Sequence, residues 1–165
     1  AATVRMLDEG LAHLAAVIEM DLGRSLLTLP GGGAAGGFGA GSVAFLGARL
    51  QMGIEAVLDL TDFDRLAADA YLVITGEGRL ERQSLRGKVV VGVARRARAL
   101  GVPVVALVGS SETDIAAAYD AGVTAVFPIN PAPTTLSEAL AHARTHLAFT
   151  VENVLRFAQC LEENR

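Results

Sequence analysis

Carboxylate, cationic and glycine residues are mixed in one short segment, residues 75–88, directly after an apolar run. Glu77 and Glu81 could hold Mg²⁺ or accept a proton, and Arg79 and Lys88 could neutralise a phosphate or a carboxylate. Phosphoryl transfer needs cations, backbone amides and a metal-binding carboxylate in one place. The segment therefore favours that chemistry, with surface ion pairing on a solvated loop as the alternative.

The glycines of this segment support a ligand site but exclude one motif. Gly76 and Gly78 would let backbone amides approach a ligand. A Walker A loop is disfavoured, because no glycine stands at the required place before Gly87 and Lys88, and Val89 follows where Ser or Thr is needed.

A second glycine-rich stretch covers residues 30–41. It satisfies the dinucleotide fingerprint G-x-G-x-x-G, with Glu55 and Asp59 downstream for a ribose contact. The fingerprint should directly follow a β-strand, however, and here residues 26–29 run into Pro30. A tract so rich in Gly and Ala also matches the fingerprint by chance. Phosphate binding at the N-terminus of the following helix is the alternative interpretation, and close helix packing or a hinge is a third. The glycines proposed for phosphate are Gly33, Gly36 and Gly37.

Other reactive side chains give weaker signals. His142 and His146 have the i, i+4 spacing of a metal pair, but no third ligand is evident and a solvated helix face is expected. Ser84 has neither a nearby histidine nor a nucleophile elbow around it. Cys160 is expected to be packed and inert.

Hydrophobic periodicity predicts the elements that position these residues. Helices are expected over residues 4–20, in two short pieces between 53 and 69, over 90–100, from Ser111 to Gly122, and from a capping box at residues 135–138 to near the end. The second short helix is expected to have Thr61 or Asp62 as its N-cap. Short apolar runs predict buried parallel strands over 71–75, 102–108 and 125–127.

This alternation of strands and helices predicts the fold class. Consecutive βαβ units indicate α/β, a Rossmann-like three-layer α/β/α arrangement with parallel strands. Three strands are few for a free-standing sheet, so we expect an incomplete one whose remaining strands lie upstream. The chain also begins with Ala-Ala-Thr rather than Met, which suggests that a preceding part has been removed.

Composition limits the partners and the compartment. The 165 residues carry a formal charge of −4, which argues against a general attraction to nucleic acid or to an anionic membrane. No apolar run approaches the roughly 18 residues that a membrane span needs. A single cysteine cannot form an internal disulfide, so a cytoplasmic location is expected.

The signature residues resemble a known family. The sequence Leu-Val-Ile-Thr-Gly-Glu-Gly-Arg at residues 72–79, continuing through Gln83-Ser84 and Gly87-Lys88, resembles the signature region of the bacterial glycerate kinase family of the first type. Residues 30–41 resemble the glycine-rich segment of the same family, and residues 101–104 and 120–127 agree with it in order. The likeness covers nearly the whole chain.

The resemblance implies an activity and a domain arrangement. Family members transfer the γ-phosphoryl group of ATP to D-glycerate, so ATP, Mg²⁺ and D-glycerate are the expected ligands. They have two α/β domains, one inserted in the other, and are about twice as long as this chain. Residues 1–60 are accordingly expected to belong to the inserted domain and residues 61–165 to the C-terminal part of the Rossmann-like domain. We expect this chain alone to be inactive, and we leave a homodimer open.

The resemblance also implies roles for residues. Glu77, Arg79 and Lys88 are expected to be catalytic, and Glu77 and Glu81 are the expected metal ligands, although the family signature has Asp where this chain has Glu81. The expected substrate- or phosphate-binding residues are Gly76, Gly78, Gln83, Ser84, Gly87 and the three glycines of the second stretch. A non-catalytic nucleotide- or sugar-acid-binding module and a dinucleotide-binding domain are the alternatives.

Overall fold

The structure is a computed structural model that describes residues 2–81 and 88–163. The chain divides into two compact units, Ala1–Gln51 and Met52–Arg165, and each is described by itself. The assignment of an inserted and a Rossmann-like domain to residues 1–60 and 61–165 stays a prediction.

The first unit is a pair of helices. Helix α1 (Ala2–Leu22) confirms the first predicted helix, and Gly23 follows it at a positive φ of 65°. Helix α2 (Ala34–Leu46) packs against α1 through a small apolar cluster of Ile18, Leu26 and Ala44. Because the last carbonyls of a helix have no partner within it, the guanidinium of Arg24 stabilises the end of α2 by donating to the carbonyl oxygens of Val43 and Ala44 at 2.7 and 3.0 Å.

The glycine-rich stretch forms the start of α2. Ala35, Gly36 and Gly37 have φ values of 51°, 69° and 87°, so a left-handed turn precedes the regular helix. Gly37 is buried, and a Cβ there would lie 2.7 Å from Cδ2 of Leu11 on α1. Close packing of the two helices therefore requires glycine at position 37.

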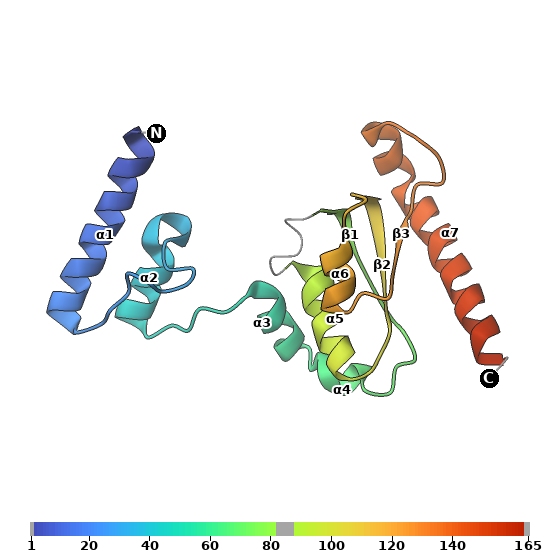
Figure 1. The fold of residues 1–165 in the computed structure, drawn as a ribbon, viewed down its shortest axis with the longest axis horizontal. Coiled ribbons are helices and arrows are strands. Elements are labelled where there is room, and N and C mark those ends of the chain that lie inside the picture. Colours follow the sequence, from blue (N-terminus) through green and yellow to red (C-terminus); the bar gives the residue numbers. More distant parts are fainter. Residues whose placement is uncertain (1, 82–87, 164–165) are drawn as a thin grey trace. The chain divides into compact units, whose positions relative to one another are not determined.

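The second unit is a parallel sheet between two helical layers (Figure 1). Its strands, in the order β1-β2-β3, are β1 (Val73–Leu80), β2 (Val104–Ser111) and β3 (Ala125–Pro128). Its helices are α3 (Gly53–Leu60), α4 (Phe63–Ala67), α5 (Val89–Ala99), α6 (Ala116–Ala121) and α7 (Leu136–Glu163). The predicted α/β class with parallel strands is confirmed.

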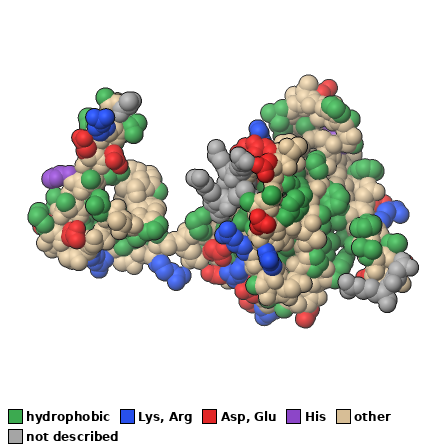
Figure 2. Space-filling model, viewed as in Figure 1, with side chains coloured by type: hydrophobic (Ala, Val, Ile, Leu, Met, Phe, Trp, Pro, Cys, Tyr) green, Lys and Arg blue, Asp and Glu red, His purple; other side chains and the backbone are tan. Residues whose placement is uncertain are grey.

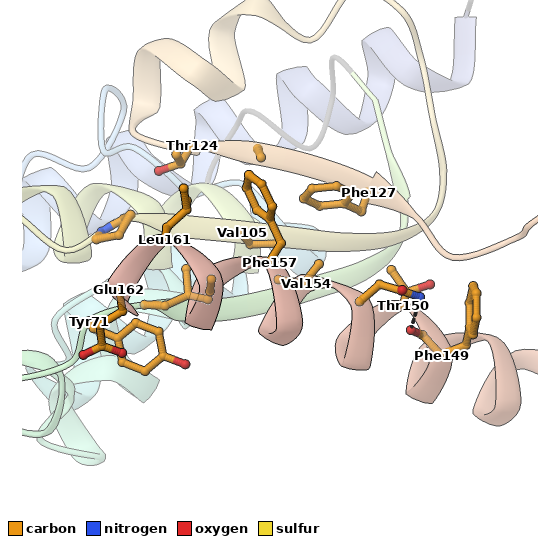
Figure 3. Close-up of a pocket in the computed structure, with 15 residues that line it drawn as sticks. Tyr71, Val105, Thr124, Phe127, Phe149, Thr150, Val154, Phe157, Leu161 and Glu162 are labelled. Carbon is orange, nitrogen blue, oxygen red and sulfur yellow. Dashed lines mark hydrogen bonds between the residues drawn. The ribbon is translucent and has the colours of Figure 1, made fainter. Parts of the chain in front are cut away.

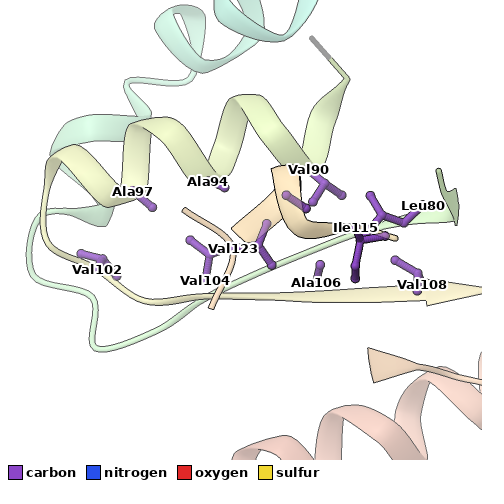
Figure 4. Packing of buried hydrophobic residues seen from close by; sticks show 11 residues of the cluster. Leu80, Val90, Ala94, Ala97, Val102, Val104, Ala106, Val108, Ile115 and Val123 are labelled. Atoms are coloured by element: carbon purple, nitrogen blue, oxygen red, sulfur yellow. The ribbon is translucent and has the colours of Figure 1, made fainter. Parts of the chain in front are cut away.

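The main core lies between the sheet and helices α5 and α6 (Figure 4). Val104, Ala106 and Val108 point into it at alternate positions of β2, and Val90, Ala94 and Ala97 meet them from α5. The helical spacing of the α5 residues and the two-residue period of the strand bring these side chains to one interface. This packing fixes the position at which α5 begins, beside the end of β1.

Helix α7 covers part of the opposite face of the sheet. Val154 packs with Val105 and Leu107 of β2 in a smaller cluster. Beside it an apolar groove of about 780 Å³ lies between the sheet and α7, and Tyr71, Phe127, Phe149, Phe157 and Leu161 are among its lining residues (Figure 3). Cys160 is exposed on α7, so the expectation that it is packed was wrong. The reason is geometric, because residue 160 lies off the helical stripe that contains Val154.

Two helix starts differ from the prediction. Asp62 occupies the N-cap position of α4, as predicted, but its backbone is left-handed (φ 53°) and, within the described residues, its side chain makes no cap bond and pairs with Arg65 instead. Thr61 ends α3, donating its hydroxyl to the carbonyl of Val57 at 2.9 Å. Helix α6 begins at Ala116 rather than at Ser111, because pairing with β1 keeps Ser111 in β2.

Side-chain interactions fix other helices. Arg96 of α5 binds Asp64 of α4 through Nε and Nη2 at 2.8 and 2.9 Å, and its Nη1 lies 2.7 Å from Asp59 and 3.3 Å from Glu55 of α3. Hydrogen bonds to Asp64 and Asp59 raise the pKa of Arg96 above its ordinary value. Acidic and basic side chains accordingly lie side by side over α3 and α5 (Figure 2).

The predicted capping box of α7 is confirmed. The amide of Glu138 donates to Oγ1 of Thr135 at 3.3 Å, and the Glu138 carboxylate accepts from the hydroxyl and the amide of Thr135 at 2.7 and 3.0 Å. The bonds that the carboxylate accepts from the hydroxyl and the amide of Thr135, with one from Thr134, lower the pKa of Glu138. Within the described residues, no helix is both long and apolar enough to span a membrane.

Candidate functional site

The glycine-containing signature lies mainly on a strand, not in a loop as the sequence predicted. β1 continues through Gly76, Glu77, Gly78 and Arg79 to Leu80, paired with β2 throughout. A Cβ at Gly76 would lie 2.5 Å from the carbonyl oxygen of Leu107, so glycine is what permits this close pairing. The signature forms a strand because the neighbouring strand β2 is as long as β1, and pairing with it extends β1 beyond its apolar residues.

Glu77 is the most unusual residue of this strand. It is half-buried opposite Val108 of β2, and its Oε1 is buried without a hydrogen-bond partner among the described residues. A buried carboxylate oxygen without a partner is costly and rare. An oxygen in this state fits a role in which a ligand hydroxyl or a cation completes its coordination.

Four charged side chains surround the end of β1. Nε of Arg79 lies 3.4 Å from Oε2 of Glu81, and Nζ of Lys88 lies 4.0 Å from Oε1 of the same carboxylate. Nη2 of Arg79 is also 3.9 Å from Oε1 of Glu112. Figure 2 shows acidic side chains gathered at this edge of the sheet. Two predicted cations and one predicted metal ligand are thus brought together within salt-bridge distance.

Local folding explains why these side chains meet. β1 ends at Leu80, whose buried side chain belongs to the core below α5, and Glu81 follows it directly. Lys88 stands at the N-cap position of α5, and its carbonyl accepts from the amide of Gly92 at 3.1 Å. The charged side chains meet because the core holds the end of β1 beside the start of α5.

Glu112 and Ser110 also lie at the end of β1, although neither was predicted as a site residue from the sequence. Ser110 is the register partner of Arg79, and the amide of Glu112 donates to the carbonyl of Leu80 at 3.0 Å. Both residues could have been predicted as site residues, because the carboxyl ends of neighbouring parallel strands lie at one edge of the sheet. Glu112 instead falls within the helix that was predicted from Ser111 to Gly122.

The remaining predicted residues are not all placed in this cluster. Gly33 and Gly36 are exposed in the turn at the start of α2, within the first unit, so their membership of one site with Glu77 stays a prediction. Gln83, Ser84 and Gly87 lie outside the described residues.

The histidine pair is a separate feature of α7. The rings of His142 and His146 have centroids 5.8 Å apart, and Nδ1 of His146 lies 3.3 Å from Oδ1 of Asn130. Across residues 2–81 and 88–163, no group of three or more His, Cys, Asp or Glu side chains is placed to hold a metal ion.

The donor set at the end of β1 nevertheless fits Mg²⁺ bound to a substrate. Mg²⁺ commonly takes one or two protein carboxylates and completes its coordination with phosphate oxygens and water. Glu77 offers a buried oxygen without a hydrogen-bond partner among the described residues, and the Glu81 carboxylate stands four residues further along the chain, beyond Leu80. Arg79 and Lys88 lie beside Glu81, so this end of β1 can bind an anion and stabilise charge that develops on it.

Comparisons with known proteins agree with this chemistry. A sequence model described as the Glycerate kinase family matches residues 1–159. A protein of Halalkalibacterium halodurans named glycerate kinase is 44% identical over 153 residues, which are 93% of this chain and 40% of the relative. A protein of Escherichia coli named glycerate 2-kinase is 40% identical over 90% of this chain and 39% of its own length.

A solved structure is similar as well. A crystal structure described as that of a glycerate kinase 2 from Salmonella typhimurium LT2 superposes with a TM-score of 0.72 at 39% identity, covering 92% of this chain and 39% of that one. The chain thus spans about 40% of the length of the curated relatives described above.

Proposed function

The chain belongs to the glycerate kinase family, and we propose that the full-length protein transfers the γ-phosphoryl group of ATP to D-glycerate. The observation that carries this proposal is the buried Oε1 of Glu77, which has no hydrogen-bond partner among residues 2–81 and 88–163, on the same strand as Arg79 at the carboxyl edge of a parallel sheet. Ligands of open parallel sheets bind at this edge.

Each residue has a distinct role in the proposal. Glu77 accepts a hydrogen bond from the substrate hydroxyl or holds the metal, which satisfies its buried oxygen. Arg79 and Lys88 neutralise phosphate or carboxylate oxygens, and Glu81 holds both cations in reach of the site. Mg²⁺ bound by Glu77 and Glu81 would supply neutralisation of the phosphate charges.

The proposal extends to product, partner and compartment. Since the E. coli relative is named a glycerate 2-kinase, we take the 2-hydroxyl as the acceptor and 2-phosphoglycerate as the product. The reaction needs ATP and Mg²⁺, so we place it in the cytoplasm.

Residues 1–165 span about 40% of the length of the relatives, and we expect this part alone to be inactive because the rest of the active site lies elsewhere in the protein. A homodimer remains a proposal that sedimentation of the full-length protein tests.

The test is ATP-dependent phosphorylation of D-glycerate by the full-length protein, by residues 1–165, and by full-length Lys88→Ala and Glu77→Gln. Coupling to enolase separates 2-phosphoglycerate from its 3-isomer. We expect an active parent, an inactive fragment, and kcat/KM lowered by about 100-fold in both variants. Glu152→Gln and Arg156→Ala remove an exposed ion pair on α7 and serve as matched controls that keep the parental rate. A folded parent that binds ATP but leaves glycerate unchanged would instead support a binding module.

A further inference from the structure

Asn130 connects the end of the sheet to helix α7. It follows β3, and the neighbouring amide of Ile129 donates to the carbonyl of Val108 at 2.8 Å, so the chain still follows β2 at this point. Nδ2 of Asn130 donates to the carbonyl of Gly109 at 2.7 Å, and Oδ1 lies 3.3 Å from Nδ1 of His146. Asn130 and His146 are both half-buried.

The chemistry of these contacts fixes the direction of each hydrogen bond. A carbonyl oxygen only accepts, so the amide nitrogen of Asn130 must face Gly109. Its Oδ1 then faces His146, and Nδ1 of that imidazole must carry the proton. The chain of donors thus runs from His146 through Asn130 to Gly109.

Gly109 is the point at which β2 meets the signature of β1. Its neighbours in the chain, Val108 and Ser110, are the register partners of Glu77 and Arg79. A Cβ at Gly109 would lie 2.5 Å from the carbonyl oxygen of Gly78, so the two backbones are in close contact there. Any displacement of Gly109 is therefore transmitted to the strand that carries both site residues.

We propose that Asn130 and His146 are positioning residues, which hold the carboxyl end of β2 against Gly78 and so set the placement of Glu77 and Arg79. This inference rests on the function proposed for that site. Neither residue contacts the site cluster in the described structure; both act through the backbone of Gly109. A misplacement of about 1 Å in a catalytic group can cost on the order of 100-fold in rate.

The test uses isosteric variants of the full-length protein. Asn130→Asp keeps the shape but loses the donor to Gly109, and His146→Leu loses the donor to Asn130. His146→Asn keeps an amide donor at the δ position and should restore most of the activity. Exposed His142, one turn earlier on α7, supplies the matched control His142→Leu. Initial rates give kcat and KM for ATP and for D-glycerate, and thermal melts give Tm.

We expect Asn130→Asp and His146→Leu to lower kcat by about 10- to 100-fold with smaller changes in KM and Tm, because the groups are displaced rather than removed. His142→Leu should match the parent. If both variants keep kcat within about twofold of the parent, or if His142→Leu loses as much as His146→Leu, the inference is wrong.

A second readout does not depend on activity. Hydrogen exchange of the amides of residues 77–80 should be at least about tenfold faster in Asn130→Asp than in the parent, and that of residues 104–106 should be unchanged. An inactive parent would overturn the proposed function, while unchanged exchange at residues 77–80 would overturn the positioning role independently.

Discussion

Nζ of Lys88 lies 4.0 Å from Oε1 of Glu81, across the segment that joins β1 to α5. The other oxygen of the same carboxylate lies 3.4 Å from Nε of Arg79, so one side chain holds two cations. The side chains are partly exposed, and such pairs contribute little to stability. We therefore expect these ion pairs to act by positioning Arg79 and Lys88 for an anionic substrate.

Substitution of Glu81 tests that placement. Glu81→Gln removes the charge that holds Arg79 and Lys88, and we expect kcat/KM of the full-length protein to fall by about 10-fold or more. Glu81→Asp keeps the charge, and a flexible Lys88 can follow the shorter side chain, so activity should stay within about threefold of the parent. Steady-state kinetics with D-glycerate and ATP measure both. Equal losses in the two variants would contradict this account.

We expect the Glu77 carboxylate to be required for activity but to lower the stability of the fold. Glu77→Met replaces a buried carboxylate oxygen, for which the described part of the chain offers no hydrogen-bond partner, by an apolar side chain of similar size. We expect the free energy of unfolding to rise by about 1 kcal/mol while kcat/KM falls below detection, since removal of an unsatisfied buried polar atom is favourable. Denaturant unfolding and activity assays on one preparation measure the two effects. A clear loss of stability would show that the carboxylate is satisfied in the folded protein.

Gly76 and Gly78 should differ sharply in their tolerance of a methyl group. Gly76→Ala brings a Cβ to 2.5 Å from the carbonyl oxygen of Leu107, which forces β1 away from β2 and should cost about 1–3 kcal/mol. At Gly78 a Cβ meets no atom of the described residues within 4 Å, so Gly78→Ala serves as the matched control and should leave the free energy of unfolding within about 0.5 kcal/mol of the parent. Similar melting temperatures for the two variants would refute the close pairing at Gly76.

The capping box of α7 predicts a pH dependence. The pKa of Glu138 is lowered in the folded chain, so its contribution to stability is present above the ordinary glutamate value of about 4.3 and is lost as the pH falls through the folded pKa. We expect Thr135→Ala to cost about 1 kcal/mol at pH 7. Denaturant unfolding of Glu138→Gln and of the parent should show a difference at pH 7 that shrinks toward pH 3. A constant difference would contradict the role of the charge.

Arg96 should not tolerate lysine. Asp64 receives two parallel hydrogen bonds from the guanidinium, and Asp59 receives a third, a geometry that an ammonium cannot reproduce. We expect Arg96→Lys to lower Tm by roughly 2–4 °C. The exposed Arg156, paired with Glu152 on α7, supplies the control Arg156→Lys, which should leave Tm unchanged. Melting curves at low and high salt measure how much of the difference in Tm between Arg96→Lys and the parent is electrostatic.

The class of the fold and the segment that carries the site could both be predicted from the order of residue types along the chain. Apolar runs of strand length between amphipathic helices required a parallel sheet with covered faces, and local chemistry fixed the capping box at Thr135. The motif around Glu77 also identified the family, because its residue types occur in a specific order that local sequence preserves.

The way in which the site is built depends instead on contacts between segments that are distant in the chain. Gly76 to Arg79 had the composition of a loop, and only the long neighbouring strand made them part of β1. The buried Oε1 of Glu77, the pairing of Arg79 with Glu112 and the contact from Asn130 to Gly109 join residues distant in the chain. Pairing between distant segments depends on the packing of the whole sheet, which the periodicity of any one segment does not contain.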